Sequence, residues 1–240
     1  MRAAAALTVT TLAATGMAAA STFSISPIRI ELSSAKPTAV LIVHSHDDSP
    51  VVVQVRPVAW SQPANEDQLD DTQEVLVTPP LFTLAPRGAQ ILRVALRRSP
   101  DSSRELDYRL VLDEVLPAKP ADFTGLRVAL RVTLPVFVAA QTHASPDLTW
   151  HHSWLPDGTL QLHVRNRGTA HIQIRDLEVQ VAGHAESSLH TDSARYLLPG
   201  SLAQWQLHTG TSIPRTGKIL IHGHSDAGDF TVSSDPGAEI

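Results

Sequence analysis

The sequence contains no cysteine among its 240 residues. No disulfide can form, so an exported form of the chain must be stable through its apolar core alone. Aromatic residues are few, at 5% of the chain, but hydrophobic residues reach 42% and charged residues 18%. This composition is typical of a folded protein and excludes disordered and collagen-like classes.

The chain also lacks a positive charge excess and a long internal apolar run. The net charge of -5 and the pI near 6.2 argue against a nucleic-acid surface. After residue 20, no apolar run approaches the ~18 residues of a transmembrane helix. The length suits one large domain or two domains of about 100 to 120 residues.

The N-terminus combines Arg2 with a short alanine-rich run that ends at Ala20. Together with Ala18, Ala20 forms an A-x-A-like cleavage site, so we predict a signal peptide over residues 1–20. The alternative is an uncleaved membrane anchor. Three threonines lower the hydrophobicity of the run, which argues against an anchor. The missing disulfides and the alanine-rich leader suit a bacterial periplasm.

Short runs of Val, Ile and Leu dominate the rest of the chain, and most of them alternate with polar residues. Seven such runs lie between residues 23 and 139, separated by turn clusters such as "HDDSP" and "APRG". Alternation with this spacing predicts an all-β sandwich. The acidic stretch "ANEDQLDD" reads as a solvated loop.

A small, polar, proline-containing segment at residues 139–148 breaks the pattern, and further short strands follow it. Such a break is typical of an interdomain hinge. We therefore predict two β-sandwich domains, over residues 21–140 and 146–240.

Histidine is the first candidate for site chemistry, with 12 copies. His151 and His152 are adjacent and would face opposite sides of a strand. His222 and His224 would share a face and could bind zinc only with further ligands from elsewhere. A structural role is therefore expected for them, and we predict no metal site.

Two other patterns fall short of a catalytic site. The segment around Ser225 resembles a G-x-S-x-G elbow, but Ala227 stands where the second glycine is needed. Asp113 and Glu114 are neighbours in a predicted strand and would face apart. We predict a protein that is not an enzyme and needs no cofactor.

Three segments together resemble the PapD-like periplasmic chaperones of pilus and fimbria assembly. They are "ISPIRIEL" (25–32), "TPPLFTLAPRGAQILRV" (78–94) and "ELDYRLVLDEVLP" (105–117). The resemblance implies two immunoglobulin-like domains in an L shape around a cleft. It also implies that the last strand of the first domain fills the open groove of a pilin subunit, a form of β-augmentation.

The segment that matches the donor strand is "LRVALRV". Its apolar residues alternate, so they share one face of a strand; they are Leu126, Val128, Leu130 and Val132. The alternation alone favours packing of this face on the protein's own core. The resemblance implies instead that it enters successive pockets of the subunit.

The resemblance also implies that an arginine and a lysine bind the terminal carboxylate of the subunit. Arg29 matches the arginine, and a guanidinium is suited to a carboxylate. The position of the family's lysine falls near Pro135, where this chain has no lysine. Arg131, Arg127 or Arg109 could replace it, and we take Arg131 as the candidate. Glu114 matches an acidic residue that helps to fix the interdomain angle.

The expected function is therefore that of a periplasmic chaperone that binds pilin or fimbrial subunits and delivers them to an outer-membrane usher. It is expected to work without ATP, nucleic acid or a membrane anchor after signal cleavage. The alternatives are a β-sandwich pilus subunit or surface adhesion module, and a periplasmic metal-binding protein that uses the histidines.

Overall fold

The computed structural model describes residues 23–118, 124, 126–181, 184–208 and 218–234. The predicted signal peptide lies outside these ranges. None of the described residues belongs to a helix that is long and apolar enough to cross a membrane. In these ranges the regular structure consists of strands and one short 3-10 turn at Pro63–Asn65. The all-β prediction is confirmed.

The first sandwich consists of two sheets. One has the order β1 (Phe23–Ser26), β3 (Thr38–Ser45), β8 (Ala89–Leu96) and β6 (Val75–Thr78). The other has the order β2 (Ile30–Leu32), β10 (Arg131–Val138), β9 (Leu106–Glu114), β4 (Val51–Ser61) and β5 (Gln68–Asp71), and β7 (Leu81–Leu84) also pairs with β4. The chain thus passes from the first sheet to the second between β1 and β2, and β2 then runs parallel to β10.

The alternation seen in the sequence explains how these sheets face each other. In β3, Leu41 and Val43 point inward, and in β9 Leu110 and Leu112 do the same; all four are fully buried. Residues two apart in a strand share a face, so each strand supplies one apolar side to the common core.

The second sandwich is built in the same way. Its smaller sheet has the order β11 (Leu148–Trp154), β12 (Thr159–Asn166) and β16 (Leu202–His208). Its larger sheet has the order β14 (His184–Thr191), β13 (Ile172–Val181), β17 (Ile219–Ser225) and β18 (Gly228–Ser234), and β15 (Arg195–Leu197) pairs with β13. Leu160 and Leu162 from one sheet pack with Leu177 and Ile221 from the other.

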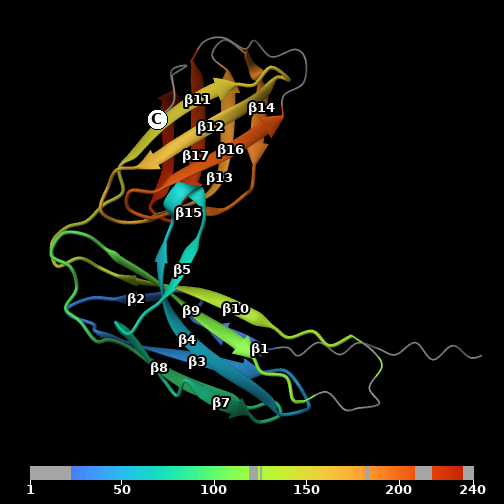
Figure 1. Cartoon of the computed structure of the whole chain (residues 1–240). Helices are drawn as coiled ribbons and strands as arrows, with labels where there is room; N and C mark the ends of the chain where they lie inside the picture. The colour runs from blue at the N-terminus through green and yellow to red at the C-terminus, as the bar shows by residue number, and fades with distance from the viewer. Residues whose placement is uncertain (1–22, 119–123, 125, 182–183, 209–217, 235–240) are drawn as a thin grey trace, which may run out of the picture.

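The two sandwiches are set at an angle to each other, as the L-shaped prediction required (Figure 1). Residues 139–147 connect β10 to β11, and the hairpin of β4 and β5 extends from the first sandwich toward β15 (Figure 1). Two local predictions were incomplete. The acidic "loop" contains β5, and β14 has no apolar alternation that would have revealed it.

Candidate binding strand and the joint between the sandwiches

The alternating apolar residues of β10 and of the segment before it are divided between the interior and the surface. Leu134, Val136 and Val138 point into the core of the first sandwich and are buried. They are held there by antiparallel pairing with β9, which extends from Arg131 opposite Asp113 along the strand. The C-terminal half of the alternating pattern is therefore used by the protein itself.

The N-terminal half of the alternating segment, residues 126–132, extends away from the core of the first sandwich. Leu130 and Val132 pack against the edge of the core and are partly buried, whereas Val128 is 50% exposed and Leu126 is 74% exposed. Residues 126–130 lie outside any strand. The sequence had predicted a strand from residue 126, but the ladder begins at Arg131 because β9, its partner, ends at Glu114.

One hydrogen-bonding edge of β10 is also partly open. Strand β2 pairs only with the end of β10, where Ile30 lies opposite Val136. Among the described residues, no strand pairs with residues 131–135 on the side away from β9. An exposed edge of this kind is a template for pairing with another chain.

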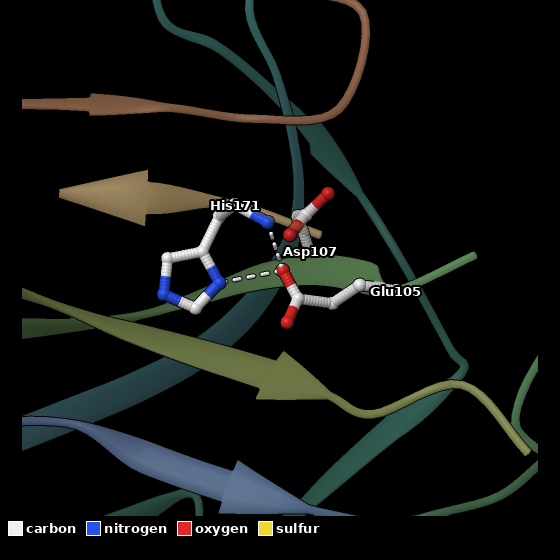
Figure 2. Close-up of side chains that lie close together, drawn as sticks. All are labelled: Glu105, Asp107 and His171. Carbon is white, nitrogen blue, oxygen red and sulfur yellow. Dashed lines mark hydrogen bonds and ion pairs between the residues drawn. The ribbon is translucent and has the colours of Figure 1, made fainter. Parts of the chain in front are cut away.

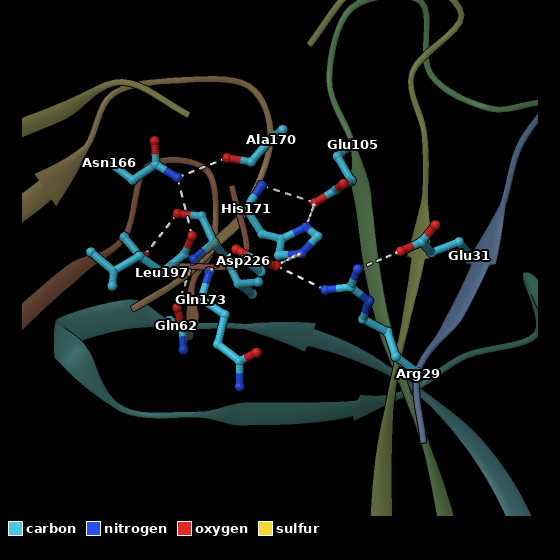
Figure 3. A network of polar contacts seen from close by, with 12 residues as sticks. Arg29, Glu31, Gln62, Glu105, Asn166, Ala170, His171, Gln173, Leu197 and Asp226 are labelled. Carbon is cyan, nitrogen blue, oxygen red and sulfur yellow. Dashed lines mark hydrogen bonds and ion pairs between the residues drawn. The ribbon is translucent and has the colours of Figure 1, made fainter. Parts of the chain in front are cut away.

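Arg29 lies one residue before Ile30 and therefore beside Pro135 in the parallel register. Its guanidinium is already engaged, at 2.7 Å from Glu31 and 2.8 Å from Asp226 (Figure 3). The side chain keeps 35% of its surface exposed.

Arg131 does not join Arg29. It pairs with Asp113 on the neighbouring strand and lies four residues before Pro135. At roughly 3.3 Å per residue, this places the two backbone positions roughly 13 Å apart along the strand. In the free protein the two guanidinium groups are held by different carboxylates, Arg29 by Glu31 and Asp226 and Arg131 by Asp113.

The joint between the sandwiches has an apolar centre. Trp60 and Phe137 from the first sandwich pack with Leu198 and Tyr196 from the second. Gln62 reinforces this contact, because its amide donates to the Tyr196 carbonyl at 3.0 Å and accepts from the backbone N–H of Leu198 at 2.9 Å.

A charged cluster lies beside this apolar centre, and His171 is its middle member (Figure 3). The ring Nδ1 of His171 is 2.6 Å from Oε1 of Glu105, and Nε2 faces Oδ2 of Asp226 at 3.5 Å. Glu105 belongs to the first sandwich, whereas the other two residues belong to the second. The same ring stacks on Phe137, with centroids 3.4 Å apart and planes at 8°.

Both carboxylates favour a charged His171. Burial lowers its pKa, but the hydrogen bonds and negative charges of Asp226 and Glu105 outweigh burial and raise the pKa to about 9. For Asp226, burial raises the pKa, but bonds from His171, the Gln173 backbone and Arg29 lower it to about 2. The cluster is thus an alternating row of negative and positive groups at neutral pH.

Asp107 adds a third carboxyl group to this cluster (Figure 2). With Glu105 and His171 it forms the one group of three potential metal ligands within 4.8 Å of one another among the described residues. Burial, the charge of Glu105 and a hydrogen bond to Glu105 raise the pKa of Asp107 to about 8. Its Oδ1 is buried without a hydrogen-bond partner.

The geometry of these three residues favours protons over a metal ion. Oε1 of Glu105 accepts from both the ring Nδ1 and the backbone N–H of His171, at 2.6 and 3.0 Å. Two N–H groups of His171 thus point at one carboxylate oxygen, so the ring Nδ1 does not offer a lone pair to a metal ion between the three residues.

The remaining sequence candidates have structural partners. His152 is buried with Nδ1 3.0 Å from Ser234, and His222 contacts Thr231 at 2.9 Å. His224 bonds Asp176 at 2.6 Å. Ser225, considered above as a nucleophile, donates to the carbonyl of Gly228 at 2.6 Å.

Glu114 was expected at the interdomain contact, but its side chain accepts the backbone N–H of Leu130 at 3.0 Å. Glu105 occupies the interdomain position. The sequence contained a signal for it, since Glu105 begins the segment "ELDYRLVLDEVLP". His171 and Asp226 carried no comparable signal, because their partners lie 66 and 197 positions away.

Comparisons with known proteins agree with this architecture. Residues 22–142 match the family model described as "Pili and flagellar-assembly chaperone, PapD N-terminal domain". No curated protein sequence matches the chain.

Solved structures with the same fold include the CsuC–CsuE chaperone–tip adhesion subunit pre-assembly complex of Acinetobacter baumannii. The TM-score is 0.65 and the identity 18%, over 90% of this chain and 100% of that one. The Salmonella enterica SafA pilin–SafB chaperone complex matches with a TM-score of 0.59 and 19% identity, over 92% and 97% of the two chains. The E. coli chaperone DraB matches with a TM-score of 0.57 and 15% identity, over 90% and 100%. At these identities the structural matches establish the fold alone. The family match covers half of the chain, and the chain therefore belongs to the PapD family of pili and flagellar-assembly chaperones.

Proposed function

We propose that this protein is a periplasmic chaperone that binds a secreted pilin or fimbrial subunit through β10 and the segment before it. In this proposal residues 126–132 complete an incomplete sandwich in the subunit, and the complex is then delivered to an outer-membrane usher. The protein does this without catalysis, ATP or a cofactor.

The observation that carries the proposal is the change from exposed to buried along the alternating apolar residues of β10 and the segment before it. Leu126 and Val128 are exposed although they continue the same alternation as the buried Leu134 and Val136. Large exposed apolar side chains in a regular row mark an interaction site more often than an accident of the surface. Leu130 and Val132, which are half-buried, lie between the two regions.

The backbone supports the same binding mode. The open edge at residues 131–135 can pair with a strand of the subunit, which supplies affinity through main-chain hydrogen bonds. The alternate side chains then supply specificity. Arg131 and Arg127 flank the apolar row, as charges commonly do where a free edge must stay soluble.

We assign the carboxylate anchor to Arg29, which lies at the joint beside Pro135. Its guanidinium is partly exposed and carries five donors, so it can hold a subunit carboxylate while keeping a bond to Asp226. Arg131, which is held by Asp113 farther along the strand, would meet a different part of the subunit.

Solved complexes of proteins with the same fold support the proposed class of partner. CsuC–CsuE is a chaperone with a tip adhesion subunit, and SafA–SafB is a pilin with its chaperone. We infer that this chain takes a partner of the same class, a secreted β-sandwich subunit that lacks one strand.

Co-expression with the small secreted proteins encoded beside this chain, followed by pull-down, tests the proposal. A 1:1 complex whose subunit degrades or aggregates without the chaperone is expected. Recovery of the chain alone, with soluble and stable neighbours in its absence, would contradict the proposed function.

A further inference from the structure

Histidine and carboxylate side chains gather on the outer face of the larger sheet in the second sandwich. His222 and His224 are two residues apart on β17, where they alternate with buried residues, so both rings point away from the core. From the sequence, this pair could bind zinc only with further ligands from elsewhere. The register of the sheet brings such ligands to the same face.

The nearest neighbours of the two histidines come from β18. Asp229 lies opposite His224, and Thr231 lies opposite His222. Opposite residues on one face have Cβ atoms about 4.5–5.5 Å apart, and residues two apart along a strand are roughly 6.6 Å apart. The four side chains therefore form a small square, and β17 is paired with β13 and β18 along its length beneath them.

Each histidine ring has a partner at Nδ1. In His224, Nδ1 is 2.6 Å from Oδ1 of Asp176 on β13, and in His222 it is 2.9 Å from Oγ1 of Thr231. An ionised carboxylate only accepts, and a hydroxyl accepts as well as donates, so both contacts suit a ring with its proton on Nδ1. The neutral form of such a ring has its lone pair on Nε2. Metal-bound histidines share this arrangement, because their other nitrogen commonly donates to a carboxylate or another acceptor.

Nε2 of His224 faces an oxygen that could bind the same ion. Oδ1 of Asp229 is 3.8 Å away, and two ligands of a tetrahedral zinc ion with bonds of about 2.1 Å are roughly 3.4 Å apart. The two side chains are 61% and 80% exposed, so they have room for this small adjustment. Among the described residues these ligand atoms do not yet lie with Nε2 of His222 within 4.8 Å of one another, so His222 has to turn about its side-chain bonds to complete the set.

The charges around the two rings favour a cation. Asp176 and Asp229 form their ion pairs with His224 rather than with lysine or arginine. The hydrogen bond and charge of Asp176, together with the charge of Asp229, raise the pKa of His224. Glu178 lies opposite His222 on β13 and adds a third carboxylate to this face. A metal ion that replaces the proton at Nε2 would be stabilised by the same negative charges.

We propose that His222, His224 and Asp229 bind one divalent transition-metal ion, with water completing its coordination. Zn²⁺ and Cu²⁺ suit this set, since imidazole is a preferred ligand of both and a carboxylate oxygen also binds zinc. Asp176 and Thr231 do not contact the ion but orient the two rings. The site goes beyond the proposed function and does not depend on it.

Calorimetric titration of the mature chain without an affinity tag tests this site, with zinc chloride and copper chloride used separately at pH 7.5. One ion per chain is expected to bind with micromolar affinity for at least one of the two metals. His222→Gln and His224→Gln should each weaken binding by more than about tenfold, since loss of even an outer partner commonly costs about that much. Both positions are on the outer face, so urea unfolding without metal should change little in these variants.

The matched control is His151→Gln. His151 lies opposite His163 on the outer face of the smaller sheet, where the neighbours of His163 along β12 are Gln161 and Arg165 rather than carboxylates. This variant should bind metal like the wild type. Absence of binding at micromolar concentrations of both metals, or unchanged affinity in His222→Gln and His224→Gln, would overturn the inference. A larger loss in His151→Gln than in His224→Gln would place the ion on the other sheet and overturn it equally.

Discussion

Arg29 in the first sandwich donates to Asp226 in the second at 2.8 Å, although 197 positions separate them in the chain. Asp226 is fixed from its other oxygen by the backbone N–H of Gln173, also at 2.8 Å. The arginine expected to hold an external carboxylate is therefore already held by an internal one. The same side chain serves subunit binding, as proposed here, and the joint between the sandwiches.

Replacing Arg29 with alanine should consequently have two effects. The yield of co-purified subunit should fall at least tenfold, because the carboxylate loses its donor. The free energy of unfolding should fall by about 1–2 kcal/mol, between the values for exposed and buried ion pairs. Pull-down and urea unfolding measure the two effects separately.

Arg87 provides the control for that variant. It forms an exposed ion pair with Asp48 at 2.9 Å, away from the joint. Arg87→Ala removes the same charge and should leave both subunit yield and stability unchanged. If Arg29→Ala behaves like Arg87→Ala, Arg29 is not part of the site.

Val128→Glu is the sharpest test of strand donation. Val128 is 50% exposed in the free protein, so a glutamate there is solvated and the free energy of unfolding should change by less than about 0.5 kcal/mol. In the complex the same charge would enter an apolar pocket unpaired, which is strongly unfavourable. Loss of subunit in pull-down is expected. Leu130→Glu should also abolish binding, but Leu130 packs against the core, so stability would fall as well.

The matched control for Val128→Glu is Leu76→Glu. Leu76 is similarly exposed, at 46%, but lies on β6 in the other sheet of the first sandwich. This variant should bind subunit normally. Equal binding by both variants would exclude residues 126–132 as the donated strand.

The sequence predicted β10 and its apolar face because alternation is a local property. It could not show where the face stops being buried, since this depends on the length of β9 and on the end of the sandwich. Leu126 and Leu134 look alike in the sequence, yet one is 74% exposed and the other 5%.

The joint was less accessible to prediction than the strands. Its residues come from segments far apart, and short polar motifs such as the one around Asp226 fit several roles. Glu114 was expected at the interdomain contact because it matches an acidic residue of the family, and only the three-dimensional packing shows that Glu105 makes this contact instead.

Acid should weaken the joint through Asp226. Its pKa in the folded protein is about 2, below its ordinary value of about 3.8, because His171, the Gln173 backbone and Arg29 stabilise the charge against the effect of burial. Its stabilisation is therefore present above about pH 4 and lost as pH falls toward 2. Asp226→Asn should be less stable than the wild type at pH 7, and the difference should shrink between pH 4 and pH 2.5 in urea unfolding. A constant difference would contradict the assignment.

Phe137 should couple the unfolding of the two sandwiches. It stacks on His171 and packs with Trp60 and Tyr196, so Phe137→Ala removes the centre of their contact. A cost of about 3–5 kcal/mol is expected. Calorimetry should show one transition for the wild type and two for the variant. Phe82→Ala, in the core of the first sandwich, is the control and should lower stability without separating the sandwiches.

Gly168, in the turn between β12 and β13, packs against the hinge segment at residues 145–147. A Cβ at this position would lie 2.5 Å from the backbone nitrogen of Asp147 and 2.7 Å from the carbonyl carbon of Pro146, and it would overlap the Ser145 carbonyl oxygen. These are backbone atoms that cannot rotate away. The turn is also bonded to the hinge through the N–H of Thr169, which donates to Ser145 at 2.9 Å. Gly168→Ala should therefore destabilise the protein by about 3 kcal/mol or displace the hinge.

The comparison variant for Gly168→Ala is Gly228→Ala. Gly228 has a φ of +113°, which strains any other residue, but no atom lies within 4 Å of the added methyl group. Only backbone strain of about 1–2 kcal/mol is expected there. Thermal unfolding of the two variants separates steric overlap at the hinge from strain in a free turn, because the overlap should cost more and should also reduce subunit retention. Equal losses of stability with normal retention would mean that residues 145–147 can shift without disturbing the joint.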